Sequence, residues 1–95
     1  MPHYIMLSRL TPEGLKTLGD NPDRLQEVNQ EVEGLGATVV NQYALLGQYD
    51  FITVLEAPDV GTVARLSANL GRRGTAHYET LAAVPVEEFI SSLKG

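Results

Sequence analysis

The sequence predicts an α+β fold in which one four-stranded antiparallel sheet carries two helices on a single face. Three observations predict it. The chain alternates as strand, helix, strand, strand, helix and strand; one helix has a clear apolar stripe; and two of the four strands are apolar on both faces. With 95 residues, the chain has room for one domain, 1–95, with a modest core of its own.

The first strand is expected over residues 4–10, because apolar side chains occupy both of its faces, as in a central strand that is covered twice. Thr11 and Pro12 then end it, since threonine is a good N-cap and proline suits the first helical position. This predicts a short helix to about residue 18. Asn21 and Pro22 repeat the signal, so a second helical stretch is expected to start there and to run to about residue 34.

The apolar residues of this second stretch recur at spacings of 3, 4 and 3, as on one face of a helix. They are Leu25, Val28, Val32 and Leu35. A strand over 37–45 is predicted to turn at Gly47, in a two-residue type II′ hairpin, into a strand over 50–56. The remaining elements are a helix over about 60–70, a strand over 75–82 and a tail helix over about 85–93.

This element order is that of a ferredoxin-like βαββαβ sandwich with a short C-terminal helix appended. Right-handed crossovers place both helices on one face, in the strand order 4-1-3-2. The two central strands are then the two that are apolar on both faces, so one apolar face lies without helices. It holds either Phe51 and Leu55 or Ile52 and Val54. A second copy of the sheet is the simplest cover, which predicts a homodimer or a larger homo-oligomer.

Composition excludes several classes of function. Lys and Arg number 7 against 12 Asp and Glu, a net charge of -5 that disfavours nucleic-acid binding. Cysteine is absent, which excludes disulfides and thiolate metal sites and favours a reducing cytoplasm. No apolar run approaches the roughly 20 residues of a membrane span. We therefore expect a cytoplasmic protein with neither nucleic acid nor membrane as partner, and with no cofactor.

Polar residues on the fourth strand give the candidate site. His77 and Glu79 lie two apart, so both point to the same face, and Arg9 falls close to His77 if strands four and one pair about their centres. We expect this face to be the helix-free one, because the helix-covered face is expected to be filled with aliphatic side chains. The candidate ligand-binding residues, which include the hairpin side chains, are Arg9, Tyr43, Tyr49, Asp50, His77 and Glu79.

Each candidate also has a structural interpretation. Asp50 is expected to accept hydrogen bonds from turn amides, and His77 with Glu79 to form an ion-pair group on the sheet. A metal site is not predicted, since His77 and Glu79 supply two ligands where a third is needed. No residue is identified as catalytic.

One segment resembles a known family. The stretch YALLGQYDFITVLEAP over residues 43–58, with Gly47, Tyr49 and Asp50, resembles the signature of the GYD-domain family. The segments LTPEG over 10–14 and GTAHYETL over 74–81 are similar as well. The resemblance implies a small prokaryotic protein of the dimeric α+β barrel type. The family is largely uncharacterised, and its structural relatives include cofactor-free monooxygenases, haem enzymes, isomerases and amino-acid sensors.

Three classes of function follow from the sequence. The first is a small-molecule binding or sensing module, assembled as a homo-oligomer. The second is a cofactor-free enzyme, monooxygenase-like or isomerase-like, that uses a cavity between paired sheets. The third is a structural or interaction subunit without a ligand. An enclosed volume lined by convergent polar groups favours either of the first two.

Overall fold

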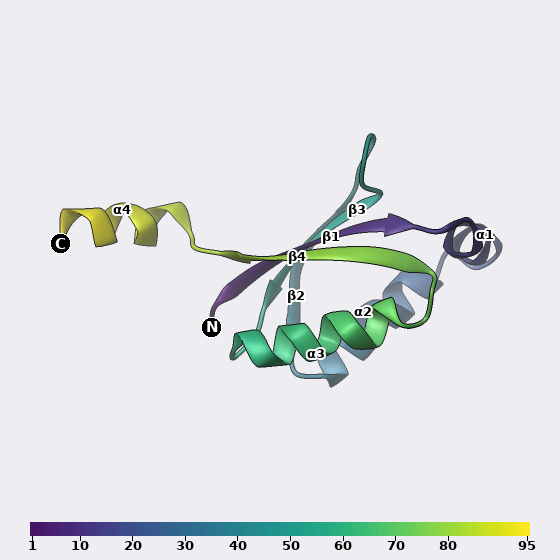
Figure 1. The fold of residues 1–95 in the computed structure, drawn as a ribbon, viewed down its shortest axis with the longest axis horizontal. Helices are drawn as coiled ribbons and strands as arrows, with labels where there is room; N and C mark the ends of the chain where they lie inside the picture. The colour runs from purple at the N-terminus through teal and green to yellow at the C-terminus, as the bar shows by residue number, and fades with distance from the viewer.

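The computed structural model describes residues 1–95 and contains four strands and four helices (Figure 1). Their order is β1 (His3–Leu10), α1 (Pro12–Asp20), α2 (Arg24–Gly34), β2 (Thr38–Ala44), β3 (Phe51–Glu56), α3 (Val60–Gly71), β4 (Ala76–Ala83) and α4 (Val86–Lys94). The predicted α+β class and the βαββαβ order are confirmed, with the helix between β1 and β2 divided into α1 and α2.

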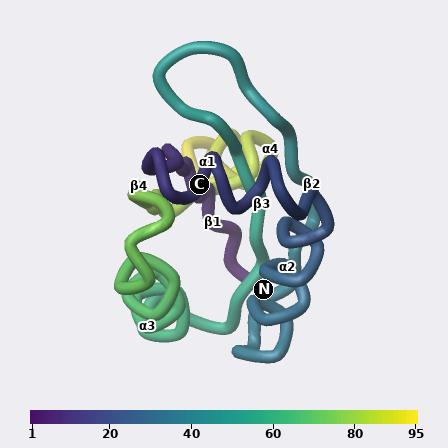
Figure 2. Tube along the Cα trace, turned by 90° about the vertical axis from the view of Figure 1, so that its right-hand side faces the viewer, coloured from purple at the N-terminus to yellow at the C-terminus, as the bar shows by residue number.

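The sheet has the predicted topology. Its strands lie in the order β2-β3-β1-β4, and every neighbouring pair is antiparallel. Figures 1 and 2 show α2 and α3 on one side of this sheet, while the loop between β2 and β3 projects on the other side. β1 and β3 are therefore central, and one sheet face is free of helices.

Side chains alternate between the two faces along each strand. Tyr4 and Met6 of β1 and Leu55 of β3 are buried beneath the helices. Ile52 and Val54 point the other way and are half-buried, so they, and not Phe51 and Leu55, belong to the helix-free face. The core consists of Tyr4, Met6, Val32, Ala37, Leu55, Ala57, Val63, Leu66 and Leu70.

Asn21 does not begin α2, which corrects the sequence prediction. α1 continues past Gly19 to Asp20, and the backbone N–H of Asn21 donates to the carbonyl of Thr17 at 3.0 Å, which closes the C-terminal end of α1. α2 begins only at Arg24. Asn–Pro marks a turn as readily as a helix start, and here it makes the turn between two helices. At the other end of α2, Leu35 follows the helix and is partly exposed, so it is not part of the buried stripe.

The β2–β3 connection is also longer than predicted. Residues 45–50 form a six-residue loop, closed by a 2.7 Å hydrogen bond from the N–H of Leu45 to the carbonyl of Asp50. Gly47 has the positive φ, 123°, that glycine adopts easily. Asp50 is thus bonded on both sides, since its N–H also donates to the carbonyl of Ser8 on β1 at 2.8 Å.

The tail helix α4 lies apart from the rest of the chain. Figure 1 shows it beyond the end of β4, so that it extends the molecule along its longest axis. None of its residues is buried. The predicted helix is thus present, but the packing that stabilises it does not come from its own sheet.

Candidate functional site

Four of the predicted residues meet on the helix-free face. The register pairs Arg9 with His77 across β1 and β4, as predicted, and Glu79 lies two residues further along β4. Tyr49 reaches over from the β2–β3 loop, and its hydroxyl donates a hydrogen bond to the Glu79 carboxylate. We call Arg9, Tyr49, His77 and Glu79 the polar cluster.

Tyr49 is a hydrogen-bond donor in this cluster and a weaker acid than a free phenol. Its hydrogen bond to Glu79 raises the pKa of the phenol above its ordinary value of 10.0, and the nearby charge of Arg9 opposes this in part. The phenol therefore stays protonated at neutral pH. Arg9, His77 and Glu79 are exposed, so the cluster lies open on the sheet and is not enclosed by this chain.

The two other candidates do not join the cluster. The Asp50 carboxylate accepts a 2.8 Å hydrogen bond from the N–H of Leu10, which fixes the loop to the end of β1. The role is structural, as expected, but the donor is an amide of β1 and not an amide of the turn itself. Tyr43 lies on the opposite edge strand, β2, with β3 and β1 between it and Glu79, a separation of about 14 Å at the usual strand spacing.

A cavity lies on the other face, between the sheet and helices α1 and α2. Its volume is about 120 Å³ and 20 residues line it, 11 of them hydrophobic. The expectation that aliphatic side chains fill the helix-covered face is therefore wrong. Gly14, Thr17 and Leu18 of α1 form one wall, and small or polar side chains such as Ser8 and Ala76 line the floor where larger ones would close it.

Three polar side chains in the wall of this cavity are joined by hydrogen bonds. Asn29 of α2 and Gln42 of β2 exchange two hydrogen bonds, of 2.7 and 3.2 Å between amide nitrogen and oxygen. Gln42 also donates to the hydroxyl of Thr53 at 2.9 Å. These bonds hold α2 against the sheet and fix the orientation of the amides in the wall.

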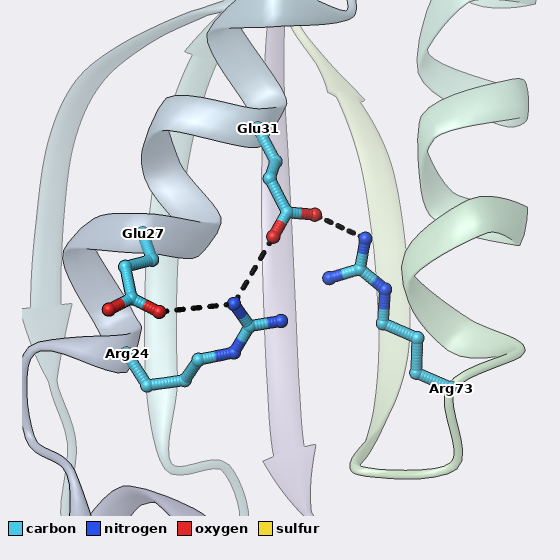
Figure 3. Close-up of polar contacts among 4 residues, drawn as sticks. All are labelled: Arg24, Glu27, Glu31 and Arg73. Atoms are coloured by element: carbon cyan, nitrogen blue, oxygen red, sulfur yellow. Dashed lines mark hydrogen bonds and ion pairs between the residues drawn. The ribbon is translucent and has the colours of Figure 1, made fainter.

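Two arginines stand at the mouth of the cavity, on either side of Glu31 (Figure 3). Arg24 of α2 lies 3.3 Å from one Glu31 carboxylate oxygen, and Arg73, in the turn after α3, is hydrogen-bonded to the other. Arg24 also contacts Glu27 at 3.3 Å. The bond from Arg73 is the main reason that the pKa of Glu31 lies below its ordinary value, so Glu31 is ionised and bridges α2 to the end of α3.

Only one signal in the sequence points to this cavity, and the sequence prediction missed it. Ser8 and Thr53 are the polar residues at helix-facing positions of the two central strands, where an aliphatic residue is the rule. Tyr78 of β4 also lines the cavity, and burial is the main cause of its raised pKa. Arg72 and Arg73 lie between two glycines, where loop arginines can bind an anion, although such arginines are more often solvent-exposed. Arg24 gave no signal, because an arginine on a helix is ordinarily solvent-exposed.

Two further properties bear on function. No three His, Cys, Asp or Glu side chains are grouped closely enough to hold a metal ion. None of the four helices has both the length and the apolar character needed to cross a membrane.

Comparisons with known proteins show the family and the fold of the chain. The chain is 52% identical over 95 residues to a Thermus thermophilus protein named glutamine synthetase and cystathionine beta-lyase binding protein, and the match covers 99% of this chain and 100% of that protein. The crystal structure of TTHA0845 from the same organism shares the fold, with a TM-score of 0.57 at 22% identity over 90% of this chain and 95% of that one. The family model for the GYD domain matches residues 4–93. The chain therefore belongs to the GYD-domain family.

Proposed function

We propose that this chain is a protein-binding module that attaches to a larger enzyme of amino-acid metabolism. The observation that carries the proposal is the 52% identity, over the whole length of both chains, to a protein named for binding glutamine synthetase and cystathionine beta-lyase. Enzymes of these two kinds are the partners we propose. Because the chain has no cysteine and does not depend on an oxidising compartment, we place this interaction in the cytoplasm.

The exposed apolar side chains of α4 support a role in protein binding. Val86, Phe89, Ile90 and Leu93 recur at helical spacing and are between 44% and 71% exposed. A nine-residue helix is marginal in water on its own, so its stability depends on a surface that covers the apolar stripe. The acidic pair Glu87 and Glu88 in the first turn favours the helix through its dipole. We assign this stripe to the enzyme partner.

The helix-free sheet face supports self-association as a separate contact. Ile5, Leu7, Ile52 and Val54 are half-buried there, and Leu81 on β4 is 45% exposed. An apolar face on two central strands is unusual in a monomer. We assign it to a second copy of this chain, which makes the module a homodimer or a larger homo-oligomer.

The enzyme contact is tested with purified proteins. The chain is immobilised, and binding of glutamine synthetase and of cystathionine beta-lyase from its own organism is measured by biolayer interferometry. At least one enzyme is expected to bind. The double variant Phe89→Ser/Leu93→Ser weakens that binding at least tenfold, while Leu46→Ser, at the fully exposed tip of the β2–β3 loop, leaves it unchanged. Failure of both enzymes to bind the unmodified chain overturns the proposal, and equal binding by the double variant removes α4 from it.

Self-association is tested by the mass in solution. Light scattering is expected to give at least twice the chain mass of 10.3 kDa at micromolar concentration. Leu81→Glu places a charge on the helix-free face at an exposed position and shifts the mass toward the monomer. Val60→Glu, at the exposed start of α3, is the control and leaves the mass unchanged. A monomeric unmodified chain rules out this contact.

Small-molecule binding is a second candidate function. The observation that favours it is the cavity of about 120 Å³ beneath α1 and α2, lined by both apolar and polar side chains. This combination of an apolar enclosure with a few oriented polar groups is typical of ligand sites. A sensing module that binds both a metabolite and an enzyme unites the two candidates.

A further inference from the structure

We propose that the cavity beneath α1 and α2 binds a small monocarboxylate, with its carboxylate between Arg24 and Arg73 and an apolar body of about the size of a benzene ring inside. This inference names the ligand class of the second candidate function and rests on it. It does not depend on the enzyme contact of α4, which lies at the far end of the molecule from α1 (Figure 1).

The size of the ligand follows from the volume. An apolar cavity of about 150 Å³ in another protein binds benzene, so a volume of about 120 Å³ accepts a ring or a short branched chain of similar bulk. Apolar side chains from three elements surround it, among them Met6 of β1, Val28 of α2 and Phe51 of β3. An apolar body is therefore favoured inside, while a large or highly charged body is excluded.

The floor of the cavity carries the hydroxyl of Ser8. Ser8 is only 7% exposed and lines the cavity, and since no buried side-chain polar atom of the chain lacks a hydrogen-bond partner, its hydroxyl is open to the cavity. A strand position beneath helices ordinarily carries an aliphatic side chain. The smaller serine leaves room at the floor for the apolar body, and its hydroxyl can bind a water molecule that accompanies the ligand.

The mouth of the cavity is arranged for a carboxylate. The two guanidinium groups each use one amino nitrogen on Glu31, and in Figure 3 the other amino nitrogens of Arg24 and Arg73 point toward one another across the gap between α2 and the turn after α3. Their side chains are 35% and 36% exposed, so they are reachable from solvent and yet shielded in part. Donors in this paired arrangement match the two oxygens of a carboxylate.

Glu31 shows that the two guanidinium groups can hold a carboxylate between them. Its carboxylate bridges Arg24 and Arg73 from one side, one oxygen on each guanidinium. A ligand carboxylate on the opposite edge of the same pair meets the remaining N–H donors without displacing Glu31. Tyr78 also lines the cavity, and its phenol can donate a hydrogen bond there.

Benzoate and benzamide form the probe pair, because they share a ring and differ in charge. Each is titrated into the full-length chain and followed by backbone amide chemical shifts. Benzoate is expected to shift the amides of Ser8, Thr53 and Tyr78 and to bind at least tenfold more tightly than benzamide. Arg24→Gln and Arg73→Gln each raise the dissociation constant of benzoate at least fivefold. Arg65→Gln, which removes the same charge from α3 outside the cavity, leaves it unchanged.

A second variant tests the enclosure separately from the charge. Val28→Phe fills the cavity from α2 and abolishes benzoate binding while the amide spectrum stays dispersed. Equal affinity for benzoate and benzamide overturns the carboxylate assignment. Absence of shifts at millimolar benzoate, or shifts confined to Arg9, His77 and Glu79 on the helix-free face, overturns the site. If enzyme binding persists in either case, only the cavity proposal fails, and the protein-binding function stands.

Discussion

Among the glycines, Gly14 is the position at which an added methyl group is expected to lower the stability of the fold most. A Cβ at Gly14 lies 1.9 Å from the carbonyl oxygen of Thr75 and 2.9 Å from its carbonyl carbon. Both atoms belong to the backbone just before β4, so no side chain can rotate away. To restore an ordinary carbon–oxygen contact of about 3.3 Å, α1 must withdraw by roughly 1.4 Å.

This withdrawal breaks the attachment of α1 to the β4 side of the sheet. The N–H of Thr11 donates to the carbonyl of Thr75 at 3.0 Å, and its hydroxyl donates to the carbonyl of Gly74 at 2.9 Å. Each bond contributes about 1 kcal/mol net, and overpacking costs about 1–3 kcal/mol more. The helix propensity of alanine returns up to about 1 kcal/mol. We expect Gly14→Ala to lower the free energy of unfolding by about 2–4 kcal/mol.

Urea denaturation followed by circular dichroism measures the effect. With a slope of about 1 kcal/mol per molar urea, the midpoint falls by about 2 M or more. Gly19→Ala is the matched control, because it lies in the same helix with no atom within 4 Å of the added Cβ. It is expected to be neutral or to stabilise slightly. A Gly14→Ala chain within about 0.5 kcal/mol of the unmodified one refutes the close-contact argument.

Three further predictions concern the ends and bridges of the helices. Thr11→Val removes the side-chain cap that accepts the N–H of Gly14 at 3.1 Å, and urea denaturation is expected to show a loss of about 1–2 kcal/mol. Glu31 has a pKa below its ordinary 4.5 in the folded chain, so its bridge stabilises above about pH 4.5 and is lost as the pH falls through the folded-state pKa. Glu31→Gln therefore destabilises by at most about 1 kcal/mol at pH 7, and this difference shrinks at pH 3; a difference that grows toward pH 3 contradicts the sign. A chain that ends at Val84 lacks α4, and its free energy of unfolding is expected to lie within about 0.5 kcal/mol of that of the full chain. A larger loss of stability means that α4 packs on its own sheet.

Sequence periodicity predicts the sheet well because each of its signals is local. The alternation of Tyr4, Met6 and Ser8 against Ile5 and Leu7 identifies a central strand without any knowledge of its neighbours. The register that places Arg9 opposite His77 follows from the antiparallel order and from strand lengths. Turn chemistry is less decisive, since Asn21 and Pro22 suit a helix start and a turn equally well.

The cavity lies beyond what sequence patterns convey. Its existence depends on how far α1 and α2 stand from the sheet, and that distance is set by Gly14 against Thr75 and by the amide pair of Asn29 and Gln42. The two residues of the amide pair are 13 positions apart in the sequence, and Gly14 and Thr75 are 61 positions apart, so no local pattern reports the distance between helices and sheet. The polar cluster was easier to predict, because strand alternation alone places His77 and Glu79 on one face.

The isolation of α4 has a thermodynamic consequence for every contact the chain makes through it. If nine residues become helical only when their apolar stripe is covered, association and local folding are one equilibrium. The helix content measured by circular dichroism then rises when the enzyme partner is added, while the strand content does not change. Part of the binding free energy is spent on ordering these residues, so the affinity is lower than the buried area suggests. Substitutions that alter only the helix propensity of α4, at positions that touch no partner, therefore change the affinity.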